Sequence, residues 1–233
     1  MTQSAMFESQ VPGWRDRSGI LLFSLFAWTV SNLDQSLFGY AVPGILSEFD
    51  IGLERIGHIL SLGFIVAAVM VVFAGLAADR YGRRWTLATL LAASALFVGL
   101  HGYVRSVPEL TLLRALAFGL AAGLAPITAA YVAESAPARH RGVLMGVLQC
   151  GYPIGWFLAA LIAAPLLESS GWRKIFLIGF AVVPVAFLIA WRLPESRRYT
   201  AVAAARLDDQ PAGFDFRLLR ELFSPAYRVR TFA

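Results

Sequence analysis

Two ionisable side chains of opposite sign lie deep inside long apolar stretches of this sequence. Asp34, flanked by Asn32 and Gln35, lies in the first stretch, and Arg114 lies in a later one. A charge at the centre of a membrane costs about 2.5–3.5 kcal/mol, so such residues usually face a protein interior and mark a transport pathway. Pairing is the least costly way to hold both charges. We therefore expect Asp34 and Arg114 to form a proton-coupling site, with Asn32 and Gln35 beside it.

The sequence leaves two alternatives to this interpretation open. The ion pair can be purely structural, with no part in transport. Arg114 follows Pro108 by only six residues, so its side chain can also extend toward the membrane surface. We favour the transport role because ionisable residues at this depth are functional candidates by default.

Three further polar side chains lie on another predicted helix. Gln149, Tyr152 and Trp156 follow one another at helical spacing and share one face. An amide, a phenol and an indole each offer a hydrogen bond beside apolar surface, so together they suit the wall of a site for a polar organic solute. The alternative is that the two aromatic side chains are core or lipid-facing bulk.

The composition indicates that membrane helices position these groups. Hydrophobic residues make up 58% of the chain and charged residues 15%, against about 25% in soluble domains. The single Cys150 excludes a disulfide framework, and the three histidines are too scattered for a metal cluster. We expect no cofactor and no metal. The net charge is +5, and the arginines collect at the ends of apolar spans, as membrane topology requires. This distribution does not indicate a nucleic-acid partner.

Six apolar runs are long enough to cross a lipid bilayer as helices. They cover residues 20–46, 56–78, 85–104, 108–132, 142–167 and 175–191. The domain organisation expected from them is an N-terminal arm at 1–19, a six-helix bundle at 20–192 and a polar loop at 193–233. That loop contains an amphipathic segment, and the chain is expected to be cut before a seventh helix.

The arginines and lysine in the connections predict the orientation. Assigned alternately to the two sides, they give ten on the side of the N-terminus and four on the other side. Positive residues concentrate in cytoplasmic loops, so both ends of the chain are expected in the cytoplasm. The near-absence of lysine, with Lys174 alone, favours a bacterial inner membrane.

Two charged turns join helices on the expected cytoplasmic side. One runs from Gly75 to Arg84, and the other runs from Glu134 to Gly142. In each turn an acid precedes a base, which predicts ion pairs between the turns; a simply solvated turn is the alternative.

The first turn resembles the signature loop between helices 2 and 3 of the major facilitator superfamily. Ala77 departs from the usual leucine, and the matching residues are Gly75, Asp79, Arg80, Gly82, Arg83 and Arg84. Three further segments resemble the sugar porter and metabolite:proton symporter branches. They are Arg114 with Gly119 and Gly123, the hairpin from Glu134 to Gly142, and the run from Pro194 to Tyr199, where Arg197 replaces the usual proline.

The resemblance implies a secondary, proton-coupled carrier that works by alternating access and has twelve helices in two halves. It implies that Asp34 and Arg114 are the coupling pair and that Gln149 faces an organic acid or a sugar-like metabolite. This chain would be the first half, with the lipid bilayer and a missing C-terminal half as partners. The resemblance also implies an inner gate, formed by Gly75, Asp79, Arg80, Gly82, Arg83, Arg84, Glu134, Arg141 and Glu195.

Other classes of membrane protein compete with a symporter. A facilitative uniporter and a non-transporting six-helix fragment that binds a partner half both remain open. Asn32 is the only asparagine, which excludes the paired Asn-Pro-Ala loops of an aquaporin. No Gly-x-Ser-Gly nucleophile is present, so a rhomboid-type protease is excluded and we expect no enzyme activity.

Overall fold

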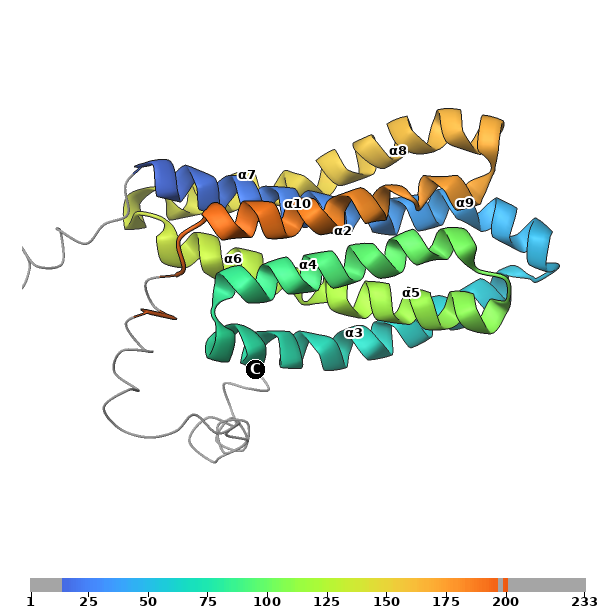
Figure 1. Ribbon diagram of the computed structural model, residues 1–233, viewed down its shortest axis with the longest axis horizontal. Helices are drawn as coiled ribbons and strands as arrows, with labels where there is room; N and C mark the ends of the chain where they lie inside the picture. The colour runs from blue at the N-terminus through green and yellow to red at the C-terminus, as the bar shows by residue number, and fades with distance from the viewer. Residues whose placement is uncertain (1–13, 197–198, 201–233) are drawn as a thin grey trace, which may run out of the picture. The chain divides into compact units, whose positions relative to one another are not determined.

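A computed structural model describes residues 14–196 and 199–200 of the chain. Residues 1–13 of the arm expected at 1–19, the amphipathic segment within 201–233 and the motif residues Arg197 and Arg198 lie outside the described residues. Residues 14–19 of the expected arm already belong to the first described helix. Within 14–196 the chain is a bundle of helices that lie alongside one another (Figure 1). The described residues contain no strand, which confirms the predicted all-α fold.

Helices occupy all six of the predicted spans. Their bounds are α2 (Trp14–Phe49), α3 (Leu53–Tyr81), α4 (Arg83–Leu100), α5 (Val107–Ala122), α6 (Leu124–Ser135), α7 (Arg141–Gln149), α8 (Gly151–Ser170), α9 (Trp172–Ile175) and α10 (Ile178–Arg192). Two short 3-10 turns, η1 (His101–Tyr103) and η2 (Ala138–His140), lie in the connections.

Two of the predicted helices are each interrupted once. The span at 108–132 divides into α5 and α6 at Gly123, and the span at 142–167 divides into α7 and α8 at Cys150. A proline lies three residues beyond each break, at Pro126 and Pro153. Proline has no N–H to donate to the carbonyl four residues earlier, so the helix ends at that carbonyl and begins again. Apolar periodicity alone does not predict these breaks.

The outer part of α2 is more regular than its composition suggests. Gly39, Pro43 and Gly44 are residues that disturb helices, yet α2 continues to Phe49. Gly44 lets Trp172 pack directly on the backbone, because a Cβ atom at this position would lie 2.6 Å from the indole Cδ1. This close packing stabilises the end of α2 beyond Pro43.

Five segments of the described chain are long and apolar enough to cross a membrane. They are Leu53–Tyr81, Arg83–Tyr103, Val107–Ser135, Ala138–Ser170 and Trp172–Arg192. α2 has 36 residues and is long enough, but Asn32, Asp34 and Gln35 lower its mean hydropathy. Asn32 and Asp34 are buried, so these polar side chains of α2 face the interior of the bundle and not its outer surface.

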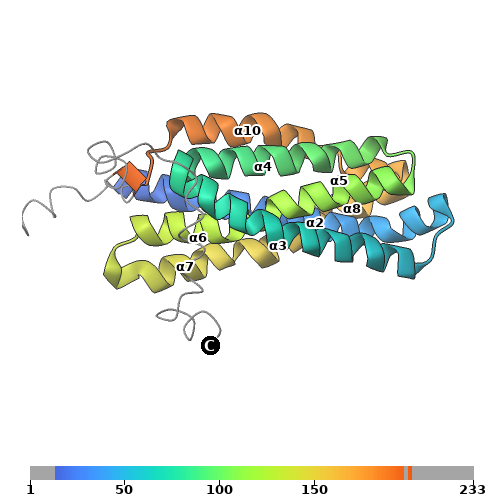
Figure 2. The same cartoon turned by 90° about the horizontal axis from the view of Figure 1, so that it is seen from below.

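Glycines allow the closest helix contacts. A Cβ atom at Gly155 of α8 would lie 2.5 Å from the carbonyl oxygen of Thr29 in α2, and one at Gly179 of α10 would lie 2.3 Å from that of Ala95 in α4. Figures 1 and 2 show α4 alongside α10 and α3 alongside α5. The small residues therefore set which helices become neighbours.

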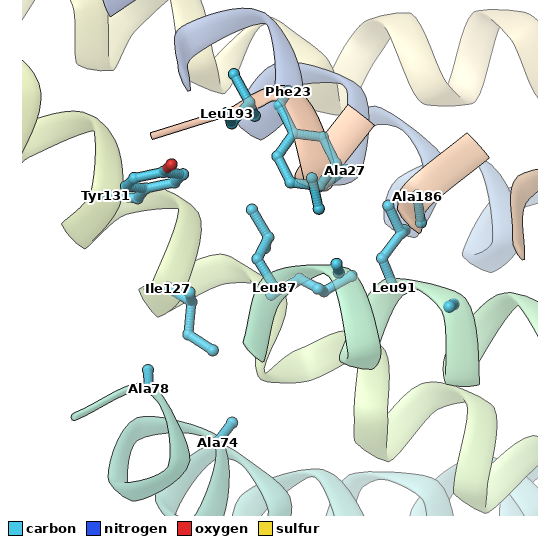
Figure 3. Packing of buried hydrophobic residues seen from close by; sticks show 14 of the residues in the cluster. Phe23, Ala27, Ala74, Ala78, Leu87, Leu91, Ile127, Tyr131, Ala186 and Leu193 are labelled. Atoms are coloured by element: carbon cyan, nitrogen blue, oxygen red, sulfur yellow. The ribbon is translucent and has the colours of Figure 1, made fainter. Parts of the chain in front are cut away.

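A hydrophobic core fills the end of the bundle at which α4 begins and α10 ends. Figure 3 shows Phe23, Leu87 and Tyr131 converging there from α2, α4 and α6. All three side chains are essentially inaccessible to solvent. This core supports the charged turn between α3 and α4, while the middle of the bundle holds the buried charges.

Candidate functional site

The structure brings Asp34 and Arg114 together in the interior of the bundle. Arg114 Nη1 of α5 donates to Asp34 Oδ2 of α2 over 3.1 Å. Arg114 is only 3% exposed and Asp34 only 5%, so the alternative in which Arg114 reaches the membrane surface is wrong. Opposite charges this deep must compensate one another.

Aromatic rings complete the surroundings of Arg114. Its guanidinium carbon lies 4.2 Å from the ring centroid of Phe38 and 5.5 Å from that of Phe118. A cation over the face of an aromatic ring is stabilised by about 2 kcal/mol or more where water is excluded. The guanidinium is therefore held by one carboxylate and two rings, which fixes its position without using all of its N–H groups.

A pocket of about 220 Å³ opens beside this arginine, between α2, α3, α5 and α8. We call it the ring-lined pocket. Its polar wall contains Arg114 and the half-buried Gln35, and its aromatic wall contains Phe38, Phe64, Phe118 and Trp156. Phe64 meets Phe118 edge to face at 4.9 Å. A flat solute with one negative charge matches this combination of one cation and several rings.

The other residues predicted for the site lie outside this pocket. Asn32 is buried in α2, where its amide donates to the Trp28 carbonyl over 2.7 Å and its Cβ faces Gly155 of α8. Tyr152 stacks on Trp156 at 5.7 Å but is half-exposed and does not line the pocket. Gln149 is exposed at the end of α7 and does not line the pocket.

His101 belongs to this region, although the sequence pattern does not single it out as a site residue. It is fully buried at the end of α4, and its Nδ1 lies 2.7 Å from the Phe97 carbonyl oxygen. Its ring stacks on Phe176 at 5.0 Å and meets Phe38 edge-on at 6.3 Å. His101 thus supports the ring that faces Arg114. The signal that could have identified it is its place at the end of an apolar span.

A second cluster of charges surrounds the turn between α3 and α4. Arg83 pairs with Asp79 at 2.6 Å and with Glu134, at the end of α6, at 3.3 Å. The predicted ion pair between the two turns is therefore present, and the alternative of a simply solvated turn is wrong. The backbone N–H groups of Arg83 and Arg84 donate to Glu195 Oε1 over 2.9 and 3.1 Å. Glu195 thus caps the positive end of α4.

The segment that follows α10 is joined to this cluster by further hydrogen bonds. The Arg84 guanidinium donates to the Leu193 carbonyl, the Tyr131 hydroxyl donates to the Pro194 carbonyl, and the Ser196 hydroxyl donates to Glu134. The cluster therefore joins three places in the chain: the α3–α4 turn, the end of α6 and the segment after α10. Asp79, near the end of α3, is the member of the cluster that pairs with Arg83 within the α3–α4 turn.

The remaining residues of the predicted gate lie around this cluster. Gly82 is in the left-handed region, with φ of +94°, directly against Glu195. Gly75 lies inside α3, and Arg80 lies 5.6 Å from the ring of Tyr81. Arg141 is exposed and forms no ion pair with any of residues 14–196.

Comparison with known proteins finds relatives that match most of the chain, among them the following three. The niacin transporter NiaP of Acinetobacter baylyi is 30% identical over 78% of this chain and 41% of its own length. The gallate transporter of Pseudomonas putida is 28% identical over 92% of this chain and 53% of its own length. Myo-inositol transporter 1A of Cryptococcus neoformans is 33% identical over 81% of this chain and 34% of its own length. The chain thus spans about half the length of these relatives or less.

The fold and the sequence pattern match the same group of proteins. The crystal structure of a bacterial homologue of the human lysosomal transporter Spinster, inward-facing and unoccupied, superposes with a TM-score of 0.74 at 20% identity. The superposition covers 80% of this chain and 45% of that one, and it concerns the fold alone. A sequence model of the Major Facilitator Superfamily matches residues 24–232.

Proposed function

The chain belongs to the major facilitator superfamily, and from this premise we propose that it forms one half of a membrane carrier that takes up a small ring carboxylate together with a proton. The observation that carries the proposal is the ion pair of Asp34 and Arg114 at the edge of the ring-lined pocket. The family and the named relatives support a transporter rather than an enzyme.

The coupling follows from competition for one guanidinium. A carboxylate that enters the ring-lined pocket attracts Arg114, which also binds Asp34. Asp34 would then be left as a buried, uncompensated charge, a state that costs several kcal/mol. Binding a proton removes that cost. Solute and proton therefore bind together, which is the requirement for symport.

The four rings of the pocket favour an aromatic solute. Ring pairs contribute about 0.5–1.5 kcal/mol beyond the area that they bury. Niacin and gallate, which the names of two relatives give as their solutes, are both flat rings that carry one carboxylate. An arginine opposite an aromatic wall would bind either compound in one orientation.

The remaining parts of the proposal concern the membrane. The carrier would lie in a bacterial inner membrane with both ends of the chain in the cytoplasm, and a second six-helix half would close the cavity. The cluster around Glu195 would form one side of an inner gate that parts as the halves rock. The gate would take in Asp79, Gly82, Arg83, Arg84 and Glu134 of the cluster and Gly75, Arg80 and Arg141 around it. Asn32, Gln149 and Tyr152 lie outside the ring-lined pocket and would act on solute only in another state of the carrier.

Uptake of matched solutes tests the assignment of the substrate. Cells that express the protein from its own gene are expected to take up niacin or gallate, but neither the neutral amide of niacin nor myo-inositol. Gly39 lines the pocket and has no atom within 4 Å of a Cβ position. We therefore expect Gly39→Leu to raise the KM of the acid by about tenfold, a loss of about 1.4 kcal/mol of binding. Gly57→Leu, equally unobstructed on α3 and outside the pocket, is the control.

A polyol is the second candidate solute, because a myo-inositol transporter is among the relatives. In that case Gln35 would be the main recognition group, and uptake of myo-inositol would exceed uptake of either acid. Such a result would overturn the carboxylate assignment while leaving the transport role in place.

A further inference from the structure

Asp34 borders a second, much smaller space on the side away from the ring-lined pocket. This space has a volume of about 20 Å³ and lies between α2, α4 and α10. Polar side chains reach it from Asp34 and Ser31 of α2 and from Ser94 of α4, and most of its other walls are apolar. The ion pair therefore separates a pocket of solute size from a space of water size.

One oxygen of Asp34 has no hydrogen-bond partner among the described residues. Oδ2 accepts from Arg114, while Oδ1 is buried and unpartnered. An unmet buried acceptor costs about 1–3 kcal/mol, and more when it is charged. Because Asp34 lines the small space and Oδ2 is engaged by Arg114, the oxygen available to that space is Oδ1.

Ser94 is the polar residue that α4 contributes to the space, while Ser31 lies on α2 with Asp34. The Ser94 hydroxyl donates to the Leu91 carbonyl over 3.0 Å, so its proton is used and its lone pairs can accept. Asp34 Oδ1 and Ser94 Oγ are thus two acceptors that face one cavity. A water molecule has two O–H groups and fits a cavity of about 10–15 Å³ or more that offers at least two polar partners.

A metal cation suits this space less well than water. Arg114 already compensates the charge of Asp34, and no other charged residue in the described chain lines the space. The nearby His101 packs on Phe38, on the side of Arg114, and does not border the space. A sodium ion would therefore add an unmatched positive charge to the interior.

We propose that one water molecule is bound in this space, donating to Asp34 Oδ1 and to Ser94 Oγ, and that Ser94 is thereby a positioning residue for Asp34. The water fixes the orientation of the carboxylate so that Oδ2 faces Arg114. It also remains a hydrogen-bond partner of Asp34 when Arg114 turns toward a solute. This last role rests on the proposed symport, whereas the water site itself does not.

Infrared difference spectra of the purified protein exchanged between H₂¹⁶O and H₂¹⁸O test the site. Wild-type protein is expected to show an isotope-sensitive O–H band of a bound water. Ser94→Val, which removes the hydroxyl and fills the space, is expected to abolish the band, and Ser94→Ala is expected to shift it. Ser36→Ala removes another buried hydroxyl, one that does not border the space, and is expected to leave the band unchanged.

Transport provides a separate measurement of the positioning role. Ser94→Val is expected to lower proton-driven accumulation at least about tenfold and to leave exchange of labelled for unlabelled solute unchanged. A band that persists in Ser94→Val, or is absent from wild type, overturns the water site. A band that appears only when sodium is present would show that the space binds a cation, and this result would also overturn the water site. If the band behaves as expected but no solute is accumulated by wild type, the proposed function fails and the site stands.

Discussion

We expect Asp34→Asn to abolish proton-driven accumulation and to reduce uptake to passive equilibration. The amide has the shape of the acid but cannot take up a proton at neutral pH, so solute binding is no longer linked to a proton. The measurement is accumulation of labelled solute, with and without a proton gradient, by cells that express the protein from its own gene. A uniporter would equilibrate its solute equally well in wild type and variant.

Stability must be measured in parallel, because the same change leaves Arg114 buried without a counter-charge. Breaking a buried ion pair by removing one partner costs about 3–5 kcal/mol. We expect Asp34→Asn and Arg114→Gln each to lower the thermal stability of the purified protein. The double variant Asp34→Asn/Arg114→Met, which has no buried charge at this point, is expected to recover stability and not accumulation.

The exposed Asp50 at the end of the same helix is the matched control. Asp50→Asn is expected to change neither accumulation nor stability. If Asp34→Asn accumulates solute as wild type does, Asp34 has no part in coupling, and the ion pair is a structural element. The double variant Asp34→Asn/Arg114→Met distinguishes a coupling role from a structural role. If the ion pair is only structural, two uncharged residues can take its place without loss of transport.

Gly82→Ala is expected to produce the largest loss of stability among changes at the α3–α4 turn. Gly82 has φ of +94°, and a Cβ atom there would lie 2.3 Å from Glu195 Oε2. Backbone strain of this kind costs about 1–3 kcal/mol. Displacing Glu195 also uncaps α4, which costs about 0.5–2 kcal/mol more. Thermal unfolding of the purified protein measures the sum.

Gly75 provides the matched comparison within the same sequence motif. It lies inside α3 with nothing within 4 Å of a Cβ position. Gly75→Ala replaces a glycine in the interior of a helix by a better helix former, so we expect it to leave the free energy of unfolding unchanged or to raise it by up to about 1 kcal/mol. Glu195→Ala removes the cap without straining the backbone. Its effect on thermal stability is expected to lie between those of Gly82→Ala and Gly75→Ala. Equal effects of both glycine changes would show that the contact between Gly82 and Glu195 does not stabilise the turn.

The helices and the central ion pair are predictable from the sequence alone. Pairing is the least costly arrangement of opposite charges in two apolar spans, so their positions in the chain favour a pair of Asp34 with Arg114, and the burial of both residues excludes the alternative at the membrane surface. The breaks at Gly123 and Cys150 escape prediction because the apolar pattern continues through them. Their cause, a missing donor at Pro126 and Pro153, is local and could have been recognised.

Contacts between distant parts of the chain are not predictable in the same way. Glu195 lies 112 residues from the backbone N–H of Arg83 that it binds. The family resemblance places both residues in one gate, but neither the resemblance nor the composition indicates that Glu195 caps α4. Gln149 and Trp156 are both exposed, but only Trp156 lines the pocket, and their helical spacing alone does not indicate which of them does so. The pocket beside Arg114 requires side chains from four helices, and only their packing brings these together.

The break at Gly123 has a consequence for how this protein can be altered by evolution or by design. Arg114 and Glu134 belong to one span across the membrane, yet the break separates the stretch that holds the ion pair from the stretch that holds the charged turn. The backbone at Gly123 keeps helical angles, with φ of −66° and ψ of −19°, and Pro126 has no N–H to donate to the carbonyl of Ala122. On the proposed function, changes that alter solute binding around Arg114 and changes that alter the charged turn around Glu134 would therefore be made in two different helices, α5 and α6.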